Sequence, residues 1–326
     1  MPNPSVTIIT GYYKRANVVK RTLQSLINQT QKDIEIIIFD DASPDNTATE
    51  IRRFIETTDD PRIVAIYHEK NIGFVAGLLD AIKWAKGEYI AIQGSGDVSY
   101  AKRLEYQKNF LDENPDVGIV GSHYENFVET SGVCRLRTPD ANTATVQSLI
   151  KKNVFTHGEV MFRKEVYEKA GGYRAEFIFC QDYDLWLRMS NHCRFGTVPK
   201  LLYRRHVDFD GVSYKPEKFI AQTRYMIIAR KLIRLSQIQQ TEILEKLTLA
   251  SLPDYVPLDN KDLQKATVMA TMRAIVWGNF HLAKILSRDY ILSKPKRNSL
   301  ILIADILKHI PFAHKVLVWI TGSQKK

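Results

Sequence analysis

Short apolar runs alternate with amphipathic segments along the first half of the chain. The runs are rich in β-branched residues, as is typical of buried strands, and the segments between them repeat apolar positions at helical spacing. Such alternation favours crossover units on a mostly parallel sheet. The pattern predicts strands at 6–9, 35–39, 63–67 and 89–93 and helices at 16–28, 47–56 and 74–85.

The alternation ends near residue 215. Beyond it, helical patterns dominate at 221–235 and 266–286, with a loop at 251–254 between them. We therefore predict an α/β domain over residues 1–214, followed by a helical extension over residues 215–326.

Charge follows the same division. The net charge is +10, yet residues 1–214 hold 27 Lys and Arg against 28 Asp and Glu, whereas residues 215–326 hold 19 against 8. In one interpretation, the basic helices pack on the first domain and leave a solvated face. In the other, these helices, with apolar positions continuing through 300–320, attach peripherally to an anionic inner membrane surface.

Composition narrows the class of protein. The 44% hydrophobic and 25% charged residues are typical of a soluble globular protein. Cys134, Cys180 and Cys193 show no paired spacing, so neither a disulfide framework nor a zinc cluster is indicated. The N-terminus lacks the pattern of a signal peptide, and no apolar stretch is long enough to span a bilayer. We expect a cytoplasmic protein.

Polar and acidic residues follow each predicted strand. In open α/β sheets, ligands bind at the carboxyl ends of the strands, where loops and helix N-termini gather. We therefore expect the functional site at this edge of the sheet. The segments concerned are 11–15, 40–43, 69–71 and 94–97.

The acids in these segments allow structural as well as functional roles. Asp40 can hold its loop by accepting backbone N–H groups, and Ser43 or Asp45 can cap the next helix. Asp41 then remains to accept the imide proton of a pyrimidine base. Residues 94–97 form either a tight turn or a glycine-rich loop that lets the backbone approach a ligand.

Two aspartates begin a predicted helix at Gln181. One of Asp182 and Asp184 can complement the positive end of the helix dipole. The other, beside Trp186, is a candidate general base.

Taken in order, these segments resemble glycosyltransferase family 2, an inverting family with the GT-A fold. The resemblance implies a Rossmann-like, mostly parallel sheet flanked by helices, and a nucleotide-diphosphate sugar donor, specifically a UDP-sugar. The matching segments are 6–15, 22–30, 36–43, 71–73, 85–90, 171–173 and 182–188.

The resemblance also implies individual roles. It places Tyr13 against the uracil ring and Asp41 at the edge of that ring. It makes Asp182 the general base and Asp97 the ligand of Mn²⁺ or Mg²⁺. His157 and Trp186 are implied to line the acceptor side, although His157 equally suits a core or capping role. Nucleotide-sugar binding is implied for Gly11, Tyr13, Arg15, Asp40, Asp41, Asn71, Gly73, Ser95, Gly96, Arg204 and His206.

The chain departs from the family pattern in three places. Gly11 stands where the family usually has Pro, and Gln181 stands where it usually has Glu. Asp97 is the only carboxylate in a motif that usually carries two or three. Because hard divalent cations prefer several oxygen ligands, we expect weak metal binding, completed by phosphate oxygens and water.

These observations predict an inverting glycosyltransferase that passes a sugar to a glycan or lipid-linked glycan in surface polysaccharide assembly. Asp182 would deprotonate the acceptor hydroxyl for direct displacement. No nucleic acid partner is expected. A dinucleotide oxidoreductase is excluded, because no compact G-x-G-x-x-G follows the first strand. The alternative is a catalytically decayed GT-A protein that binds a nucleotide or glycan, which the thinned metal motif favours.

Overall fold

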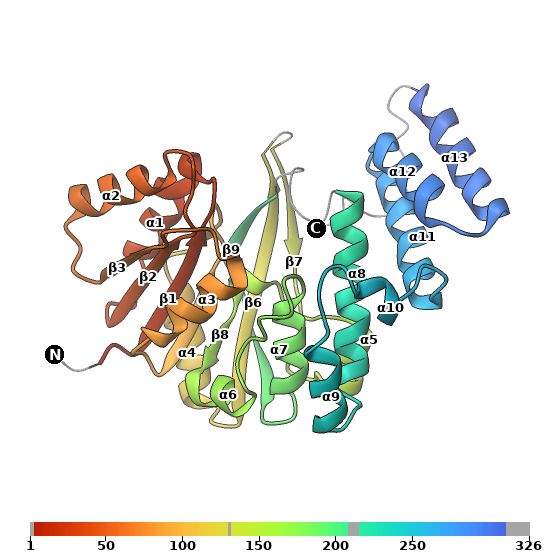
Figure 1. Ribbon diagram of the computed structural model, residues 1–326. Helices are drawn as coiled ribbons and strands as arrows, with labels where there is room; N and C mark the ends of the chain where they lie inside the picture. The colour runs from red at the N-terminus through yellow and green to blue at the C-terminus, as the bar shows by residue number, and fades with distance from the viewer. Residues whose placement is uncertain (1–2, 130–131, 208–214, 311–326) are drawn as a thin grey trace. The chain divides into compact units, whose positions relative to one another are not determined.

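The computed structural model describes residues 3–129, 132–207 and 215–310. The chain divides into two compact units, Met1–Val207 and Asp208–Lys326. The first unit is α/β and the second is helical (Figure 1).

In the described part of the first unit, nine strands form one sheet in the order β3-β2-β1-β4-β8-β6-β9-β5, with β7 paired to β6 (Figure 1). β3, β2, β1 and β4 are parallel, β8 runs antiparallel to β4, and β6 and β9 are parallel. The strands are β1 (Val6–Tyr12), β2 (Ile34–Asp40), β3 (Ile63–Tyr67), β4 (Tyr89–Gln93), β5 (Val98–Ser99), β6 (Val117–Val128), β7 (Val133–Arg137), β8 (Met161–Arg163) and β9 (Arg194–Val207).

The parallel register brings the strand ends to one edge. Tyr12, the last residue of β1, lies opposite Asp40 of β2, and Asp40 lies opposite Tyr67 of β3. On the other side of β1, Thr10 lies opposite Gln93, where β4 ends. The loops that follow these strands therefore start side by side. The four predicted strands are confirmed, with β1 and β2 longer than predicted.

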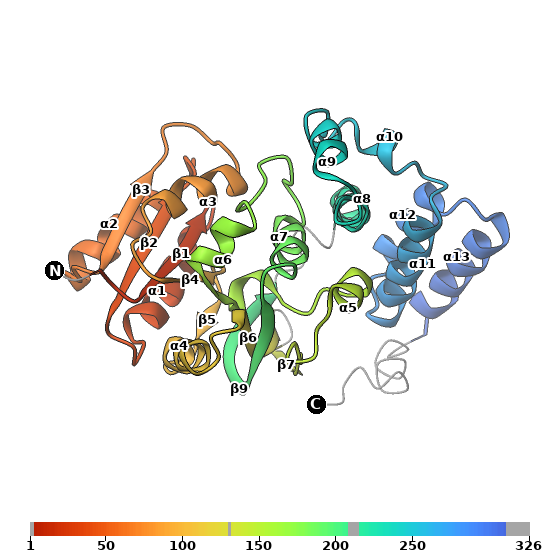
Figure 2. The same ribbon diagram turned by 90° about the horizontal axis from the view of Figure 1, so that it is seen from below.

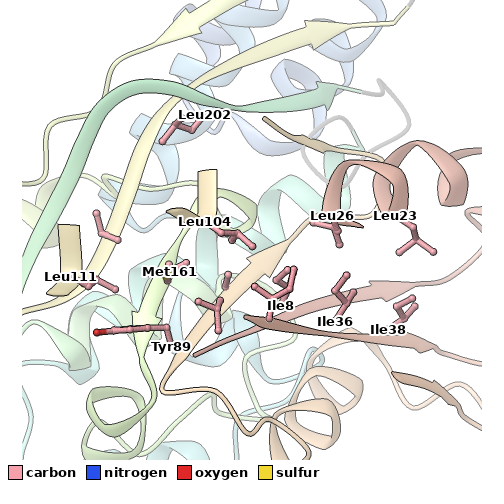
Figure 3. Packing of buried hydrophobic residues seen from close by; sticks show 14 of the residues in the cluster. Ile8, Leu23, Leu26, Ile36, Ile38, Tyr89, Leu104, Leu111, Met161 and Leu202 are labelled. Atoms are coloured by element: carbon pink, nitrogen blue, oxygen red, sulfur yellow. The ribbon is translucent and has the colours of Figure 1, made fainter. Parts of the chain in front are cut away.

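Helices cover both faces of the sheet. On one face, a core cluster joins Leu23 and Leu26 of α1 and Leu104 of α4 to Ile8 and Ile36 of the strands (Figure 3). α3 packs against β1 and β2 from the other face. The helices of this unit are η1 (Ala16–Val18), α1 (Val19–Ile27), α2 (Thr47–Thr58), α3 (Phe74–Lys83), α4 (Arg103–Glu113), α5 (Val146–Lys151), η2 (His157–Glu159), α6 (Lys164–Lys169) and α7 (Gln181–Met189).

The second unit is built from helices around a small apolar core that includes Ile275, Ala283, Ile291 and Leu300. None of the helices in the described residues combines the length and apolarity needed to cross a membrane. Its helices are α8 (Pro216–Leu232), α9 (Gln237–Leu244), α10 (Leu252–Tyr255), α11 (Lys261–Val276), α12 (Phe280–Tyr290) and α13 (Lys294–Lys308) (Figure 2).

Two sequence predictions for this unit are wrong in detail. The single helical pattern at 266–286 is two helices, because Gly278 adopts a φ of +73° and ends α11. Asn279 then caps α12 by accepting a hydrogen bond from the Leu282 N–H. The predicted loop at 251–254 overlaps the short helix α10, which runs from Leu252 to Tyr255. Residues 311–320 of the predicted apolar pattern lie outside the described residues.

Candidate active site

The loop after β1 is joined to the segment after β2 by hydrogen bonds from backbone N–H groups to side-chain hydroxyls. The Lys14 N–H donates to Ser43 Oγ at 3.0 Å, and the Arg15 N–H donates to Thr47 Oγ1 at 2.8 Å. Lys14 and Ala42 both adopt left-handed conformations, at φ values of 54° and 53°. Such strain costs about 1–2 kcal/mol per non-glycine residue and is found most often at functional sites.

The two aspartates at the end of β2, Asp40 and Asp41, are buried and hold the loops in place. Asp40 accepts a hydrogen bond from the Ser43 N–H at 3.1 Å, which confirms its predicted role as a backbone partner. Asp41 accepts from the N–H groups of Ile72 and Gly73, at 2.8 and 2.9 Å, and its Oδ1 lies 3.2 Å from Nδ1 of His68. Asp41 thus joins the ends of β2 and β3 to the start of α3.

The other predicted donor residues differ in accessibility. The Tyr13 ring is 44% exposed, with the Lys14 ammonium 5.3 Å from its centroid, so one face of the loop presents an open aromatic surface. Asn71 donates to the Asp41 carbonyl at 3.0 Å. Gly11 is buried, and a Cβ there would overlap the Phe39 ring, which explains glycine at this position.

Residues Gly94–Asp97 form a tight turn between β4 and β5, closed by the Asp97 N–H donating to the Gly94 carbonyl at 3.1 Å. The turn is attached to α1, because the Gly96 N–H donates to Thr22 Oγ1 at 2.8 Å. Ser95 lies within it. A Cβ at Gly94 would overlap the Asp97 carboxylate, so the turn depends on the missing side chain.

Asp97 points inward. Its Oδ2 accepts from the Tyr203 hydroxyl at 2.6 Å, and its Oδ1 accepts from the His206 N–H at 2.8 Å. Burial raises the pKa of Asp97 to about 6, although both hydrogen bonds and the nearby Arg205 charge act to lower it. Tyr203 also accepts from the Gly94 N–H at 3.1 Å. The carboxylate therefore locks the β4–β5 turn to β9.

This arrangement does not fit a resident divalent cation. A hard cation needs several accessible oxygen ligands, and both oxygens of Asp97 already accept hydrogen bonds inside the protein. Among the described residues, no group of three or more His, Cys, Asp or Glu side chains is placed to hold a metal ion.

Three basic residues near the end of β9, Arg204 to His206, alternate between the two faces of the strand. Arg204 donates from Nε to Glu125 Oε1 at 2.6 Å, and Nδ1 of His206 lies 2.8 Å from Glu129 Oε1. Arg205 is exposed, and its guanidinium has no hydrogen-bond partner in the part of the chain that the structure describes. Because side chains alternate along a strand, Arg205 shares the face of Tyr203, near Asp97.

An aromatic cluster lies next to this turn, around His157. Nε2 of His157 lies 2.8 Å from the Tyr173 hydroxyl, and the His157 ring lies 6.0 Å from Phe74 and 6.3 Å from Trp186. Burial lowers the pKa of His157, and the Asp182 charge opposes that effect. Trp186 is fully buried, so it supports His157 from behind and does not itself face an acceptor.

The two aspartates of α7 have different surroundings. Asp184 is buried between two arginines, with Oδ1 3.2 Å from Nη1 of Arg174 and Oδ2 2.7 Å from Nη2 of Arg188. Asp182 is partly exposed, and its carboxylate has no hydrogen-bond or ion-pair partner among the described residues. Its charge acts on both His157 and Tyr173, which places it beside the aromatic cluster.

These parts form one continuous site. A Cβ at Gly158 would overlap the Tyr203 hydroxyl and approach the Gly94 nitrogen, so the His157 segment packs directly on the β4–β5 turn. Phe74, at the start of α3, connects the Asp41 loop to His157. The structure thus brings together the strand-end loops, Asp97, His157 and Asp182.

Sequence reasoning missed three residues here. His68 is the first residue after β3, whereas the segment selected from the sequence began at residue 69. Including the first residue after each strand would have found it. Strand alternation from Tyr203 would have selected Arg205. Glu159 is fully buried, and burial raises its pKa to about 8, but no sequence signal distinguishes it from an exposed glutamate.

The chain is similar to known proteins in both sequence and fold. The profile of Glycosyl transferase family 2 matches residues 7–171. The putative glycosyltransferase EpsE of Bacillus subtilis is 28% identical over 295 residues, covering 89% of this chain and 98% of EpsE. The O-antigen biosynthesis glycosyltransferase WbnJ of Escherichia coli is 30% identical over 209 residues, covering 62% of this chain and 80% of WbnJ.

Solved structures share the fold. The mannosyltransferase PcManGT of Pyrobaculum calidifontis, in complex with GDP-Man and Mn²⁺, superposes with a TM-score of 0.57 at 18% identity, covering 94% of this chain and 87% of PcManGT. S. aureus TarS 1–349 in complex with UDP gives 0.56 at 15% identity, covering 98% and 92%. The predicted GT-A fold is confirmed, and the chain belongs to glycosyl transferase family 2 and is a glycosyltransferase.

Proposed function

We propose that this glycosyltransferase moves a sugar from a UDP-sugar to an acceptor hydroxyl on a glycan, with inversion at the anomeric carbon. The observation that carries the proposal is the Asp182 carboxylate, which lies beside His157 and has no partner among the described residues. Asp184, two positions later, is instead paired with two arginines. A general base must be accessible and free to take a proton, and the Asp182 carboxylate is partly exposed and has no hydrogen-bond partner among the described residues.

The donor would bind along the loops after β1 and β2. The exposed Tyr13 ring offers a stacking surface for the base, and the Asp41 loop supplies its hydrogen-bonding edge. Arg205, exposed near Asp97, is the cation best placed for the diphosphate, since Arg204 is held by Glu125. TarS in complex with UDP supports a uridine donor, whereas PcManGT binds GDP-Man.

The proposed reaction is a direct displacement. Asp182 removes the proton from the acceptor hydroxyl as its oxygen forms a bond to the anomeric carbon, and the nucleoside diphosphate leaves from the opposite face. Attack opposite the leaving group inverts the configuration, as in inverting glycosidases. His157 and Tyr173 shape the acceptor side beside Asp182. No step runs through a metal ion.

The acceptor side of the proposal follows the relatives. WbnJ acts in O-antigen biosynthesis, which supports a glycan or lipid-linked glycan acceptor in surface polysaccharide assembly. A lipid-linked acceptor lies at a membrane, so we further propose that the basic helical unit makes peripheral contact with the inner face of the cytoplasmic membrane.

A catalytically decayed binding protein is the second candidate. It is favoured by the inward orientation of Asp97 and the pairing of Arg204 with Glu125, since both side chains already have partners within the protein. Binding of a nucleotide without any release of UDP from a panel of UDP-sugars would select this candidate.

Calorimetric titration of UDP, with GDP in parallel, tests the donor. We expect UDP to bind and Tyr13→Ala to weaken it about tenfold, because base stacking contributes about 1–3 kcal/mol. Trp84→Ala, which removes an exposed aromatic outside the site, is the matched control and should leave the affinity unchanged.

The same titration with Asp41→Ala and Asp97→Ala, with and without Mn²⁺, tests the loops and the metal. Both variants should bind UDP more weakly, and we expect Mn²⁺ to change the parent's affinity by less than about tenfold, since Asp97 is already engaged. Binding of GDP but not UDP would overturn the uridine assignment, and binding of neither would overturn the donor site.

A further inference from the structure

We propose that one face of the helical unit is a docking surface for an anionic lipid bilayer, with three lysines contacting the phosphate head groups. The surface is formed by α11, the start of α13 and the loop before it (Figure 2). This proposal rests on the membrane contact proposed above and deepens it, by naming the residues and the lipid class.

An open hollow of about 590 Å³ lies at its centre. Lys261, Lys265 and Lys296 line it, together with apolar side chains that include Met269 and Leu292. None of the three lysines has a hydrogen-bond or ion-pair partner among the described residues. The lining contains one acid, Asp259. The hollow therefore combines net positive charge with an apolar floor, which suits a phosphate attached to an acyl chain.

The hollow is a built feature of the fold. Gln264 donates from its side-chain amide to the Tyr290 carbonyl at 2.8 Å and accepts from the Leu292 N–H at 3.0 Å. The α12–α13 connection is thereby fixed to α11. A salt bridge between Lys284 and Asp305 further ties α12 to α13. The lysines thus stand on a rigid frame, which lowers the entropy lost on binding.

Exposed apolar side chains extend the surface in two directions. On α11, Met269 and Met272 are 54% and 51% exposed. On α13, Ile303 follows Lys296 by seven residues, so helical periodicity places it on the same face of the helix as Lys296, which lines the hollow. Ile303 is 43% exposed, and Leu302 and Ile306 on the same helix are 60% and 52% exposed.

A bilayer explains this combination better than solvent or a protein partner does. Soluble proteins rarely expose a contiguous apolar stripe, and such stripes mark interaction surfaces. Helices that lie on anionic membranes carry lysines beside exposed apolar residues, as here. The residues 215–326 that contain the surface have a large excess of Lys and Arg over Asp and Glu. Charge complementarity therefore favours anionic lipid over a second copy of this basic unit.

Flotation of the full chain with vesicles tests the proposal. One set of vesicles is phosphatidylcholine alone, and the other adds about 30 mol% phosphatidylglycerol. We expect binding to the anionic set only, and weaker binding as salt rises, because salt screens the attraction. Equal binding to both sets, or to neither, would overturn the proposal.

A pair of matched triple variants locates the contact. Lys261→Ala with Lys265→Ala and Lys296→Ala should weaken vesicle binding about 100-fold, at about fivefold per lysine. Lys218→Ala with Lys231→Ala and Lys246→Ala removes the same charge from elsewhere on the unit and should cost far less. Equal losses in the two triple variants would show diffuse attraction and reject the hollow.

The apolar stripe is tested in the same way. Ile303→Gln with Ile306→Gln should weaken vesicle binding more than Ile238→Gln with Leu249→Gln, which replaces apolar residues exposed elsewhere. Sedimentation of the chain without lipid tests the rival occupant, and a dimer that dissociates in the Ile303 variant would overturn the lipid assignment. UDP titration of all variants separates failure of this surface from failure of the donor site.

Discussion

Substituting Asp182 and Asp184 by asparagine should separate catalysis from stability on a single helix. The two residues are two positions apart in α7, and the substitutions remove one charge each. Asp182 has no hydrogen-bond partner among the described residues, whereas Asp184 bonds two arginines. The expected results are therefore opposite.

Asp182→Asn should lower turnover about 100- to 10,000-fold, the range lost when a general base is removed. Its effect on stability should be less than about 1 kcal/mol, since the side chain contributes only its charge near the helix N-terminus. UDP affinity should be unchanged, because the proposed role of Asp182 is on the acceptor side.

Asp184→Asn should instead destabilise the fold. Asn keeps one acceptor oxygen but leaves Arg174 and Arg188 without their shared carboxylate, and breaking a buried ion pair costs about 3–5 kcal/mol. With part of the hydrogen bonding retained, a loss of about 3 kcal/mol lowers Tm by about 6–12 °C for a domain of this size. Turnover of the folded variant should stay within about tenfold of the parent.

The assay is release of UDP from a panel of UDP-sugars, run beside thermal unfolding of each variant. A general base elsewhere is indicated if Asp182→Asn retains more than about a tenth of the parent's rate. The structural interpretation of Asp184 fails if its Tm matches that of the parent.

Two further predictions concern the β4–β5 turn and β9. Burial raises the pKa of Asp97 to about 6, so the folded state holds a proton that the unfolded chain has lost between about pH 4 and pH 6, and the free energy of unfolding falls as pH rises through this window. Asp97→Asn lacks this titrating group, so its free energy of unfolding should rise relative to that of the parent by up to about 3 kcal/mol between about pH 4 and about pH 8. Thermal unfolding across this pH range measures the change as a shift in Tm. A difference in Tm between variant and parent that does not change with pH would reject the raised pKa. Arg205→Ala should weaken binding of UDP about tenfold without weakening that of uridine, as measured by calorimetry, because a charge-assisted bond to phosphate is lost. Arg204→Ala, the matched control, should leave both affinities unchanged. If Arg204→Ala weakens UDP binding and Arg205→Ala does not, Arg204 is the residue that binds the diphosphate.

Local periodicity predicted β1 to β4 because each is a short, mainly apolar segment that is followed by polar residues. β1 to β4 are buried along almost their whole length or are short and bounded by polar loops, so their pattern is unambiguous. β6 and β9 are long, irregular and only partly buried, with register shifts between them, so no simple alternation marks them. α11 ends because of Gly278. A helix can contain a glycine, so hydrophobic periodicity alone does not reveal the end of the helix there.

Site residues could be predicted from the sequence where they directly follow a strand. The orientation of their side chains could not be predicted where it depends on residues far away in the sequence. The resemblance selected Asp97, but its inward orientation depends on Tyr203, 106 residues away. The helix-dipole argument left Asp182 and Asp184 equivalent. Arg188, four residues after Asp184, is a signal that sequence spacing alone contains, whereas Arg174 becomes a partner only through the fold.

The acids of this site therefore differ in what the fold leaves available to a substrate. Asp41, Asp97 and Asp184 accept hydrogen bonds on both carboxylate oxygens from groups of the protein itself. Each is costly to remove because its removal leaves buried donors unpaired, and a large loss of activity there does not by itself identify a reacting group. Asp182 leaves no such donors behind. A loss of turnover at Asp182 without a loss of stability is consequently the one result among these four acids that reports on proton transfer.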